Sequence, residues 1–157
     1  MIFITTGTQL PFDRLIRVID NIAPLLNEEL VAQVHCSNYH PQHIKTVGFL
    51  PPDEFDKLFT EARLIVAHAG MGTILSALQT GKPIIVFPRI AAQGEHRNEH
   101  QLATAEKMRK QGWVYVATEE AELKSLLLTP NLHPLFRIGS VADDSLTQSI
   151  ADFVVKG

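Results

Sequence analysis

Short apolar runs alternate along this chain with longer stretches in which apolar residues recur every three or four positions. The first strand candidate is residues 2–5, and the stretch that follows places Leu15, Ile16 and Ile19 on one face of a helix over residues 12–26. Strand runs that are apolar throughout are typical of a parallel sheet covered by helices on both faces. The alternation therefore predicts an α/β fold with one doubly wound, mostly parallel sheet.

Further elements continue this alternation to the end of the chain. Strands are predicted at residues 30–35, 44–49, 64–68, 84–87 and 114–116. Helices are predicted at residues 51–62, 73–80, 95–111, 119–128 and 143–155. Pro24 predicts a break near the end of the first helix, and Gly81 predicts the C-cap of the helix before it. With no repeat or linker, residues 1–157 are expected to form a single domain, in which the role of residues 130–157 is left open.

The composition excludes several classes of protein. Apolar residues make up 45% of the chain and charged residues 20%, with a net charge of −3, so we expect a folded domain without a nucleic-acid partner. The longest apolar run, residues 113–117, is far below the ~20 residues of a membrane span. No signal peptide is visible, and the single Cys36 fits a reducing compartment. We therefore expect a cytoplasmic protein whose membrane role, if it has one, comes through a partner.

Doubly wound sheets bind ligands at the carboxyl ends of their strands, so the residues that follow each predicted strand are the functional candidates. These are residues 7–9, 48–50, 68–73, 88–89 and 95–101. The set is rich in glycine, hydroxyl and amide groups. Such groups suit a ligand that carries both phosphates and hydroxyls.

A glycine-rich turn follows the strand predicted at residues 64–68. Gly70 and Gly72 would let backbone N–H groups approach an anion at the start of the next helix, and Thr73 would add a hydroxyl. The dinucleotide-binding fingerprint fails because Leu75 stands where its third glycine belongs, and no Gly-Lys-Ser/Thr of a P-loop follows. The motif alone leaves two interpretations open: a phosphate-binding turn, or a tight turn without a ligand.

Residues 96–100, His-Arg-Asn-Glu-His, match the H-x-x-E-H pattern of the inverted zinc peptidases. His96 and His100 would share one helix face, and Glu99 would be the required acid. A zinc site also needs a third protein ligand, and nothing singles one out near this helix. A solvated helix start, or polar contacts to a sugar, is the favoured interpretation. His68, at a strand end, fits a structural histidine and a ligand contact equally well.

Four ordered motifs within residues 1–128 resemble the C-terminal, donor-binding domain of the family 28 glycosyltransferases, which have the GT-B fold with Rossmann-like lobes. The stand-alone small subunits of two-component transferases are the most similar group: the PssE-type subunit of exopolysaccharide synthesis, and the eukaryotic catalytic subunit that adds the second N-acetylglucosamine to the dolichol-linked oligosaccharide. The motifs are residues 4–8 with 11–15, residues 68–75, residues 81–88 and residues 98–103.

The resemblance implies an inverting transfer from a UDP-sugar that needs no metal and no other cofactor. Gly70, Gly72 and Thr73 would hold the diphosphate, and the backbone of Leu50 would meet the uracil. The other implied donor-binding residues are His68, His100 and Gln101 at the sugar or diphosphate, and Gly7 and Thr8 where donor meets acceptor. Ser76 stands where the related peptidoglycan transferase has a ribose-binding Glu, so the stronger charge-assisted bond is lost there.

A GT-B enzyme has two lobes, and this chain is long enough for one. The resemblance implies that a membrane-associated, acceptor-binding subunit supplies the other lobe and that the acceptor is a lipid-linked sugar. The catalytic base would then belong to the partner, with Asp13 and His68 as weaker candidates in this chain. The alternative is a binding or regulatory module that holds a nucleotide sugar without catalysing transfer.

Overall fold

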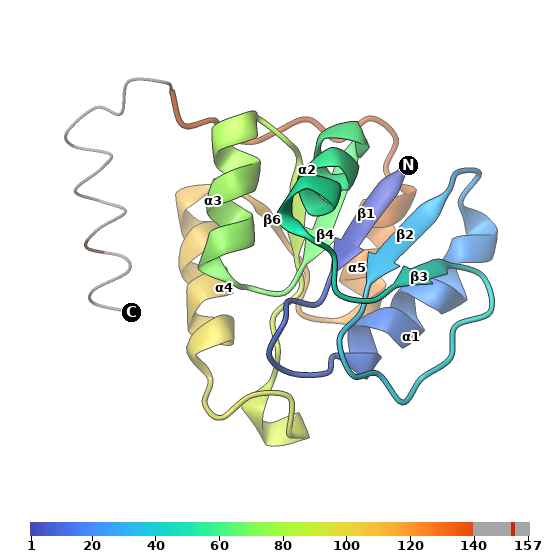
Figure 1. Ribbon diagram of the computed structural model, residues 1–157. Coiled ribbons are helices and arrows are strands. Elements are labelled where there is room, and N and C mark those ends of the chain that lie inside the picture. The colour runs from blue at the N-terminus through green and yellow to red at the C-terminus, as the bar shows by residue number, and fades with distance from the viewer. Residues whose placement is uncertain (140–151, 153–157) are drawn as a thin grey trace.

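The computed structural model describes residues 1–139 and 152, and its centre is one parallel sheet (Figure 1). Among these residues six strands are ordered β3-β2-β1-β4-β5-β6, and every neighbouring pair is parallel. The strands are β1 (Ile2–Thr5), β2 (Leu30–Gln33), β3 (Lys45–Val47), β4 (Leu64–Ala67), β5 (Ile84–Val86) and β6 (Tyr115–Val116). The predicted fold class is therefore confirmed.

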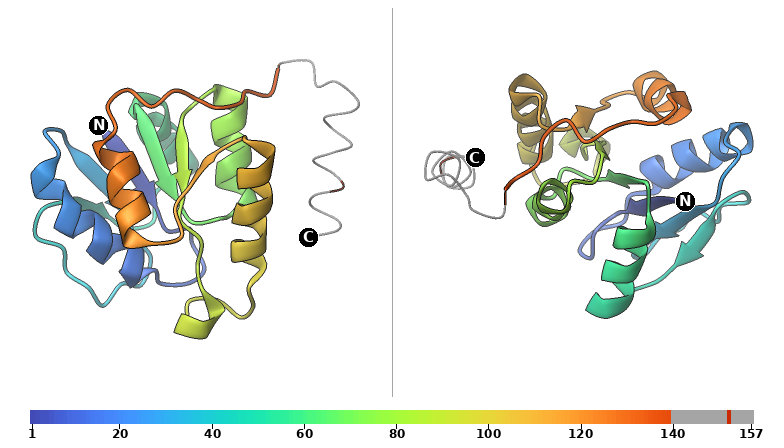
Figure 2. Two further views of the ribbon diagram at one scale, coloured as in Figure 1. Left: turned by 180° about the vertical axis from the view of Figure 1, so that it is seen from behind. Right: turned by 90° about the horizontal axis from the view of Figure 1, so that it is seen from above.

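Helices cover both faces of this sheet (Figure 2). They are α1 (Asp13–Ile22), α2 (Pro52–Glu61), α3 (Met71–Thr80), α4 (His100–Gln111) and α5 (Glu120–Leu128), with 3-10 turns η1 (Ala23–Leu25) and η2 (Ala91–Gln93). Ile2 and Ile4 of β1 pack with α1 and α5, whereas Phe3 between them packs with α2, α3 and α4. Side chains of a strand point alternately to its two faces, so one apolar strand contributes to both layers of the core.

The element boundaries agree with the prediction in most places. Gly81 ends α3 in the left-handed conformation, with φ +66°, as its C-cap role requires. The α-helical part of α1 ends at Ile22, and Pro24 lies in the 3-10 turn that follows. The helix predicted at residues 143–155 falls outside the described residues except for Asp152, which is helical.

One predicted helix start was wrong. We expected a helix from residue 95, but α4 begins at His100, and residues 95–99 form a loop. The reason is tertiary: the carboxylate of Glu95 accepts hydrogen bonds from the Arg14 guanidinium and from the N–H of Ile90. These bonds hold Glu95 in the loop, so it does not form the first turn of a helix.

The strand order reverses between β1 and β4, whose neighbours β2 and β5 lie on opposite sides of them. Thr5, the last residue of β1, is in register with Gln33 of β2 and with Ala67 of β4. The loops that leave these strands therefore start at the same level and diverge, which opens a crevice at the carboxyl edge of the sheet. No helix in the described part of the chain is long and apolar enough to cross a membrane.

Candidate functional site

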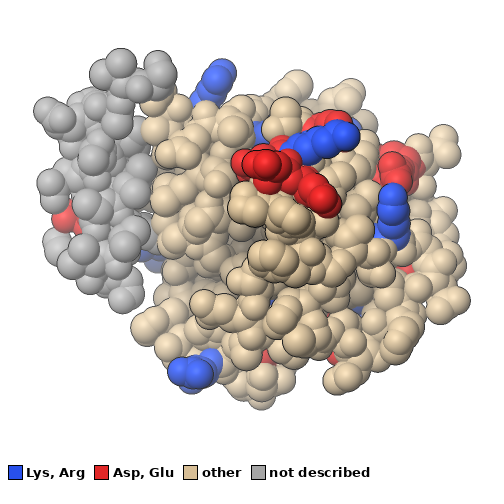
Figure 3. All heavy atoms as spheres, in the orientation of Figure 1, with Lys and Arg blue, Asp and Glu red and all other residues tan. Residues whose placement is uncertain are grey.

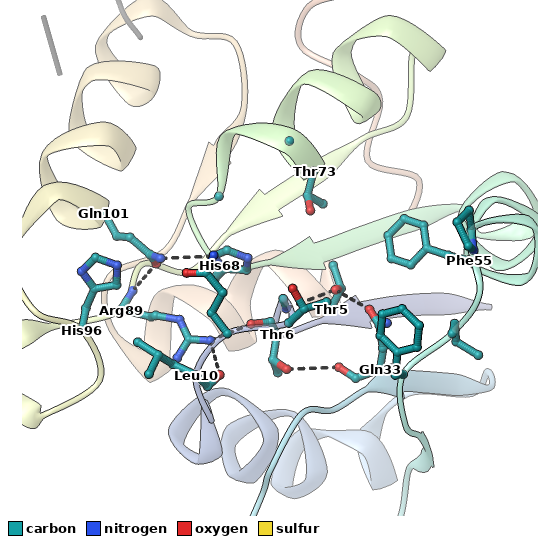
Figure 4. A pocket seen from close by; sticks show the side chains of 18 of the residues that line it. Thr5, Thr6, Leu10, Gln33, Phe55, His68, Thr73, Arg89, His96 and Gln101 are labelled. Carbon is teal, nitrogen blue, oxygen red and sulfur yellow. Dashed lines mark hydrogen bonds between the residues drawn. The ribbon is translucent and has the colours of Figure 1, made fainter. Parts of the chain in front are cut away.

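A cavity of about 710 Å³ lies at this carboxyl edge, where the strand order reverses (Figure 4). Most of the predicted donor-binding residues line it: Gly7, Thr8, Leu50, His68, Gly70, Gly72, Thr73 and Gln101. They come from the loops after β1, β3 and β4 and from the starts of α3 and α4, so residues far apart in the sequence meet in one place. The structure thus brings together most of the residues that the sequence singled out.

Three candidates lie outside the lining of this cavity. Ser76 is on the second turn of α3, and His100 is exposed at the start of α4. Asp13 does not line it either, and its carboxylate accepts hydrogen bonds from the Ser37 hydroxyl at 2.6 Å and from the Asn38 N–H at 3.3 Å. These bonds tie α1 to the loop after β2, which is a structural role for Asp13.

His68 lies at the centre of the site, between the backbones of two glycines. A Cβ built on Gly7 would lie 2.6 Å from Nε2 of His68, and a Cβ built on Gly70 would overlap Cε1 of the same ring. Gly7 also has a φ of +76°, which favours glycine on its own account. The two glycines therefore make the space that the imidazole occupies.

A hydrogen-bond relay fixes the proton of this imidazole. The N–H of Arg89 donates to Oε1 of Gln101 at 3.1 Å, which orients the amide, and Nε2 of Gln101 then donates to Nδ1 of His68 at 3.2 Å. Because Nδ1 accepts, a neutral His68 carries its proton on Nε2, the nitrogen beside Gly7. The site therefore presents an N–H donor here.

The charge state of His68 is set by its surroundings. Burial lowers its pKa to about 4, and the nearby positive charge of Arg89 acts in the same direction, against the opposing effect of the Gln101 hydrogen bond. His68 is thus neutral near pH 7. A histidine that is neutral, with its accepting nitrogen occupied and its proton on the other, is suited to donating a hydrogen bond rather than to taking up a proton.

Arg89 is buried, and its guanidinium holds the loop after β1 in place. It donates to the carbonyls of Thr6 at 2.6 Å and Leu10 at 2.7 Å, and also to that of Pro11. Its guanidinium carbon lies 4.6 Å from the ring centre of Phe12, which covers it. The hydrogen bonds of the Arg89 guanidinium therefore go mainly to backbone carbonyls of the loop that carries Gly7.

The start of α3 faces the cavity. Gly70 is its N-cap and makes no side-chain cap bond, so the first N–H groups of α3 have no side-chain acceptor from that residue. A Cβ built on Gly72 would meet no atom within 4 Å, and Thr73 follows with its hydroxyl over the cavity (Figure 4). A helix N-terminus with open space before it is suited to an anion.

The opposite end of the cavity is mainly apolar. It is lined by Phe49, Leu50, Pro52 and Phe55, from the loop after β3 and from α2. Phe49 is 74% exposed, which is unusual for so large an apolar side chain. On the face shown in Figure 3 the charged side chains gather mainly over α2, and the lower part of that face, where the strands end, is largely uncharged. The cavity thus has a polar end at β4 and β5 and an apolar end at β3.

The geometry does not support the zinc pattern. His96 lies in the loop before α4, not on the helix that carries His100, and its Nδ1 is 3.1 Å from Oδ1 of Asn98. Glu99 accepts a hydrogen bond from the N–H of Ala92. Within the described residues no group of three or more His, Cys, Asp or Glu side chains is placed to hold a metal ion. The expectation that His96 and His100 share a helix face was therefore wrong.

The sequence missed several residues of the cavity. Thr5, Thr6 and Gln33 belong to strand ends, where their polar side chains among apolar neighbours were the available signal. It also missed Leu10, Pro52, Phe55 and Asp56. Gln9, Phe49, Arg89 and His96 line the cavity as well, and they were among the candidates that follow the predicted strands. Their roles depend on neighbours from other strands, which the sequence alone does not place.

Comparisons with known proteins agree with this architecture. The model of the glycosyltransferase family 28 C-terminal domain matches residues 1–153. The UDP-N-acetylglucosamine transferase subunit ALG13 of Mus musculus is 30% identical over 127 residues, which are 74% of this chain and 10% of the relative. The subunit of the same name from Yarrowia lipolytica is 26% identical over 121 residues, 69% of this chain and 60% of the relative. The chain thus matches about a tenth of the mouse protein.

Two solved structures share the fold. The solution structure of ALG13 has a TM-score of 0.62 and 19% identity, and the alignment covers 99% of this chain and 96% of that one. The crystal structure of Acinetobacter baumannii MurG has a TM-score of 0.63 and 17% identity, and covers 100% of this chain but 50% of that one. At these identities the likeness shows the fold alone.

Proposed function

The chain belongs to the family of the glycosyltransferase family 28 C-terminal domain, and on that premise we propose that it is the donor-binding subunit of a two-component, inverting glycosyltransferase. It moves a sugar from a UDP-sugar to a lipid-linked acceptor in the synthesis of a polysaccharide or glycan. The observation that carries the proposal is the division of the cavity into three parts: the N-terminus of α3, a mainly apolar end at β3, and a polar end at His68 and Gln101.

Each part of a UDP-sugar has a counterpart in this cavity. The diphosphate lies at the start of α3, where the open space beside Gly72 admits it and Thr73 adds a hydroxyl. The uracil lies at the apolar end, against the backbone of Leu50. The sugar lies at the polar end with His68 and Gln101, facing Gly7 and Thr8. We propose that neutral donors and the N-terminus of α3 stabilise the diphosphate in place of a metal ion.

The catalytic base is proposed to come from the acceptor-binding partner. A base must lie within hydrogen-bond reach of the acceptor hydroxyl whose proton it takes. Asp13 is held by Ser37 and Asn38 outside the cavity, and His68 presents N–H rather than a free lone pair. The partner lobe would also close over the cavity and exclude water, which otherwise competes with the acceptor for the sugar.

The name that the mouse and Yarrowia relatives share supports dependence on a partner, because each is called a transferase subunit. For this chain we propose a partner that is associated with the membrane and binds the lipid-linked acceptor. The chain itself would be cytoplasmic and recruited to the membrane surface by that partner, as in exopolysaccharide synthesis.

Ligand binding tests the first half of the proposal. UDP should raise the melting temperature of the isolated chain, because a ligand that binds only the native state stabilises it by mass action. ADP and NAD at the same concentration should raise it much less. Equal shifts from all three would mean that the apolar end does not select uracil.

Transfer tests the second half. The chain should be assayed with a panel of UDP-sugars and a lipid-linked acceptor, alone and with the acceptor-binding partner. We expect the partner to raise the transfer rate by orders of magnitude while the affinity for UDP changes little. Transfer by the isolated chain at the rate of the pair would contradict the half-enzyme proposal. UDP binding without transfer in either case would favour the non-catalytic nucleotide-sugar-binding module.

A further inference from the structure

Gln33, the last residue of β2, is a buried polar side chain to which the proposed function gives no role. It is 5% exposed, and it lines the cavity. A carboxamide has two hydrogen-bonding ends, an accepting oxygen and a donating NH2 group. Burying either end without a partner is costly, so both ends of Gln33 need an explanation.

The oxygen end is accounted for within the chain. The N–H of Gly7 donates to Oγ1 of Thr5 at 3.3 Å, and the Thr5 hydroxyl donates to Oε1 of Gln33 at 3.0 Å. The reverse orientation of the amide would bring two donors to Oγ1 of Thr5 and leave the hydroxyl proton without an acceptor. The carbonyl of Gln33 therefore faces Thr5, and its NH2 group faces the other way.

The NH2 end is directed into the cavity. Within the described residues every fully buried side-chain nitrogen or oxygen has a hydrogen-bond partner, and Nε2 of Gln33 makes no bond there. Nε2 is therefore one of the few atoms of this residue that solvent reaches, and the cavity is the space that Gln33 lines. An oriented donor on a nearly buried side chain is placed to meet a ligand.

The strand order indicates which part of the ligand the NH2 group of Gln33 would contact. Gln33 is in register with Thr5 on one side and with Val47 on the other, and Phe49 and Leu50 follow Val47. His68 follows β4, two strands away, which is about 10 Å at the usual strand spacing. Figure 4 shows Gln33 and Phe55 at one end of the cavity and His68, Gln101 and His96 at the other. Gln33 thus lies on the nucleoside side.

We propose that Nε2 of Gln33 donates a hydrogen bond to an oxygen of the nucleoside, either a pyrimidine carbonyl or a ribose hydroxyl. The inference rests on the proposed function, because it takes a nucleoside diphosphate as the ligand. A buried donor that is matched by the right nucleoside is left unpaired by the wrong one, so Gln33 contributes to selectivity as well as affinity.

The test compares three ligands on the wild-type chain and on Gln33→Met, which keeps the length of the side chain and removes both polar ends. Binding of UDP, uridine and inorganic diphosphate is measured by titration. We expect UDP and uridine to bind about tenfold more weakly to the variant, the usual effect of one lost hydrogen bond. Inorganic diphosphate should bind the variant and the wild type equally, because it does not reach the end of β2.

Two analogues separate the possible acceptors. If the ribose 2′-hydroxyl accepts the bond, 2′-deoxy-UDP binds the wild type more weakly than UDP does, and the Gln33→Met change costs it no further affinity. If the uracil 4-carbonyl accepts, CDP shows that behaviour instead. If both analogues lose affinity in the variant as UDP does, the acceptor is another nucleoside oxygen, such as the 2-carbonyl, which both analogues retain.

A second variant protects the test against misfolding. Gln33→Glu keeps an acceptor for the Thr5 hydroxyl and removes the donor, and its effect is read with uridine, which carries no phosphate to repel. Unchanged uridine binding in both variants, or an equal loss of inorganic diphosphate binding, would overturn the inference while leaving UDP as the ligand. Failure of the wild-type chain to bind any nucleotide would instead overturn the proposed function.

Discussion

Nε2 of Gln101 donates a hydrogen bond to Nδ1 of His68 across 3.2 Å. This bond and the one between Thr5 and Gln33 have the same form: each is the second step of a relay that starts at a backbone N–H, of Arg89 or of Gly7. Both relays leave a neutral donor at the cavity. The guanidinium of Arg89 donates its hydrogen bonds to backbone carbonyls. The site therefore offers an anionic ligand oriented dipoles rather than a free cation.

The low pKa of His68 makes the stability of the protein depend on pH. Its pKa is about 4 in the folded chain and about 6.5 in an unfolded one, so the unfolded chain binds more protons between these values. The free energy of unfolding should include the full contribution of His68 above about pH 6.5. It should fall by on the order of 2 to 3 kcal/mol as the pH drops to 4. Urea unfolding across this range measures the effect.

His68→Asn is the matched control, because asparagine keeps an acceptor for Gln101 but does not titrate. The variant should lose most of the slope between pH 4 and 6.5. The same slope in both proteins would assign the pH dependence between pH 4 and 6.5 to titratable groups other than His68.

Two glycines of the same turn should respond differently to substitution. Gly72→Val has open space around the new side chain, so the protein should fold while the branched group fills the space assigned to the diphosphate. Gly70→Ala would push against the His68 ring and should destabilise the fold. Melting temperature and UDP titration separate the two effects. Wild-type UDP affinity in folded Gly72→Val would remove the diphosphate from this turn.

Arg89 should be a determinant of stability. Arg89→Met removes the donor to the carbonyls of Thr6, Leu10 and Pro11 and leaves them partly buried without it, which should cost about 3 kcal/mol or more. Arg17→Met is the control, because Arg17 is exposed and lies over the ring of Tyr39. Its cost should be within about 1 kcal/mol. Equal costs for the two variants in chemical unfolding would refute the role of Arg89.

Chelation should leave donor binding intact. EDTA treatment is expected not to change UDP affinity. Glu99→Ala is expected to change it little, because among the described contacts the Glu99 carboxylate accepts a hydrogen bond from the N–H of Ala92 alone. Elemental analysis of the purified chain provides the independent measurement. One zinc per chain, together with UDP binding that EDTA abolishes, would contradict the metal-independent proposal.

Much of the fold was predictable because it depends on local features. The apolar run of Leu64–Ala67 and the helical spacing of Leu15, Ile16 and Ile19 each require a particular local structure to bury their side chains. Gly81 ends a helix because of its own conformational freedom. The glycine turn at residues 70–73 was found as a site candidate for the same reason.

Other features depended on contacts between distant segments. The sequence pattern predicts that Glu95 begins a helix. Its partner Arg14, 81 positions away, holds it in a loop instead. The sequence makes Asp13 a candidate base, yet its carboxylate accepts a hydrogen bond from Ser37 and does not line the cavity. The sequence by itself determined the sheet, its helices and the turn beside the ligand, because those follow from local backbone preference and apolar spacing. Only the tertiary structure decided which polar side chains are free to act, because a hydrogen bond between distant residues decides whether a donor such as Nε2 of Gln33 or His68 faces the cavity.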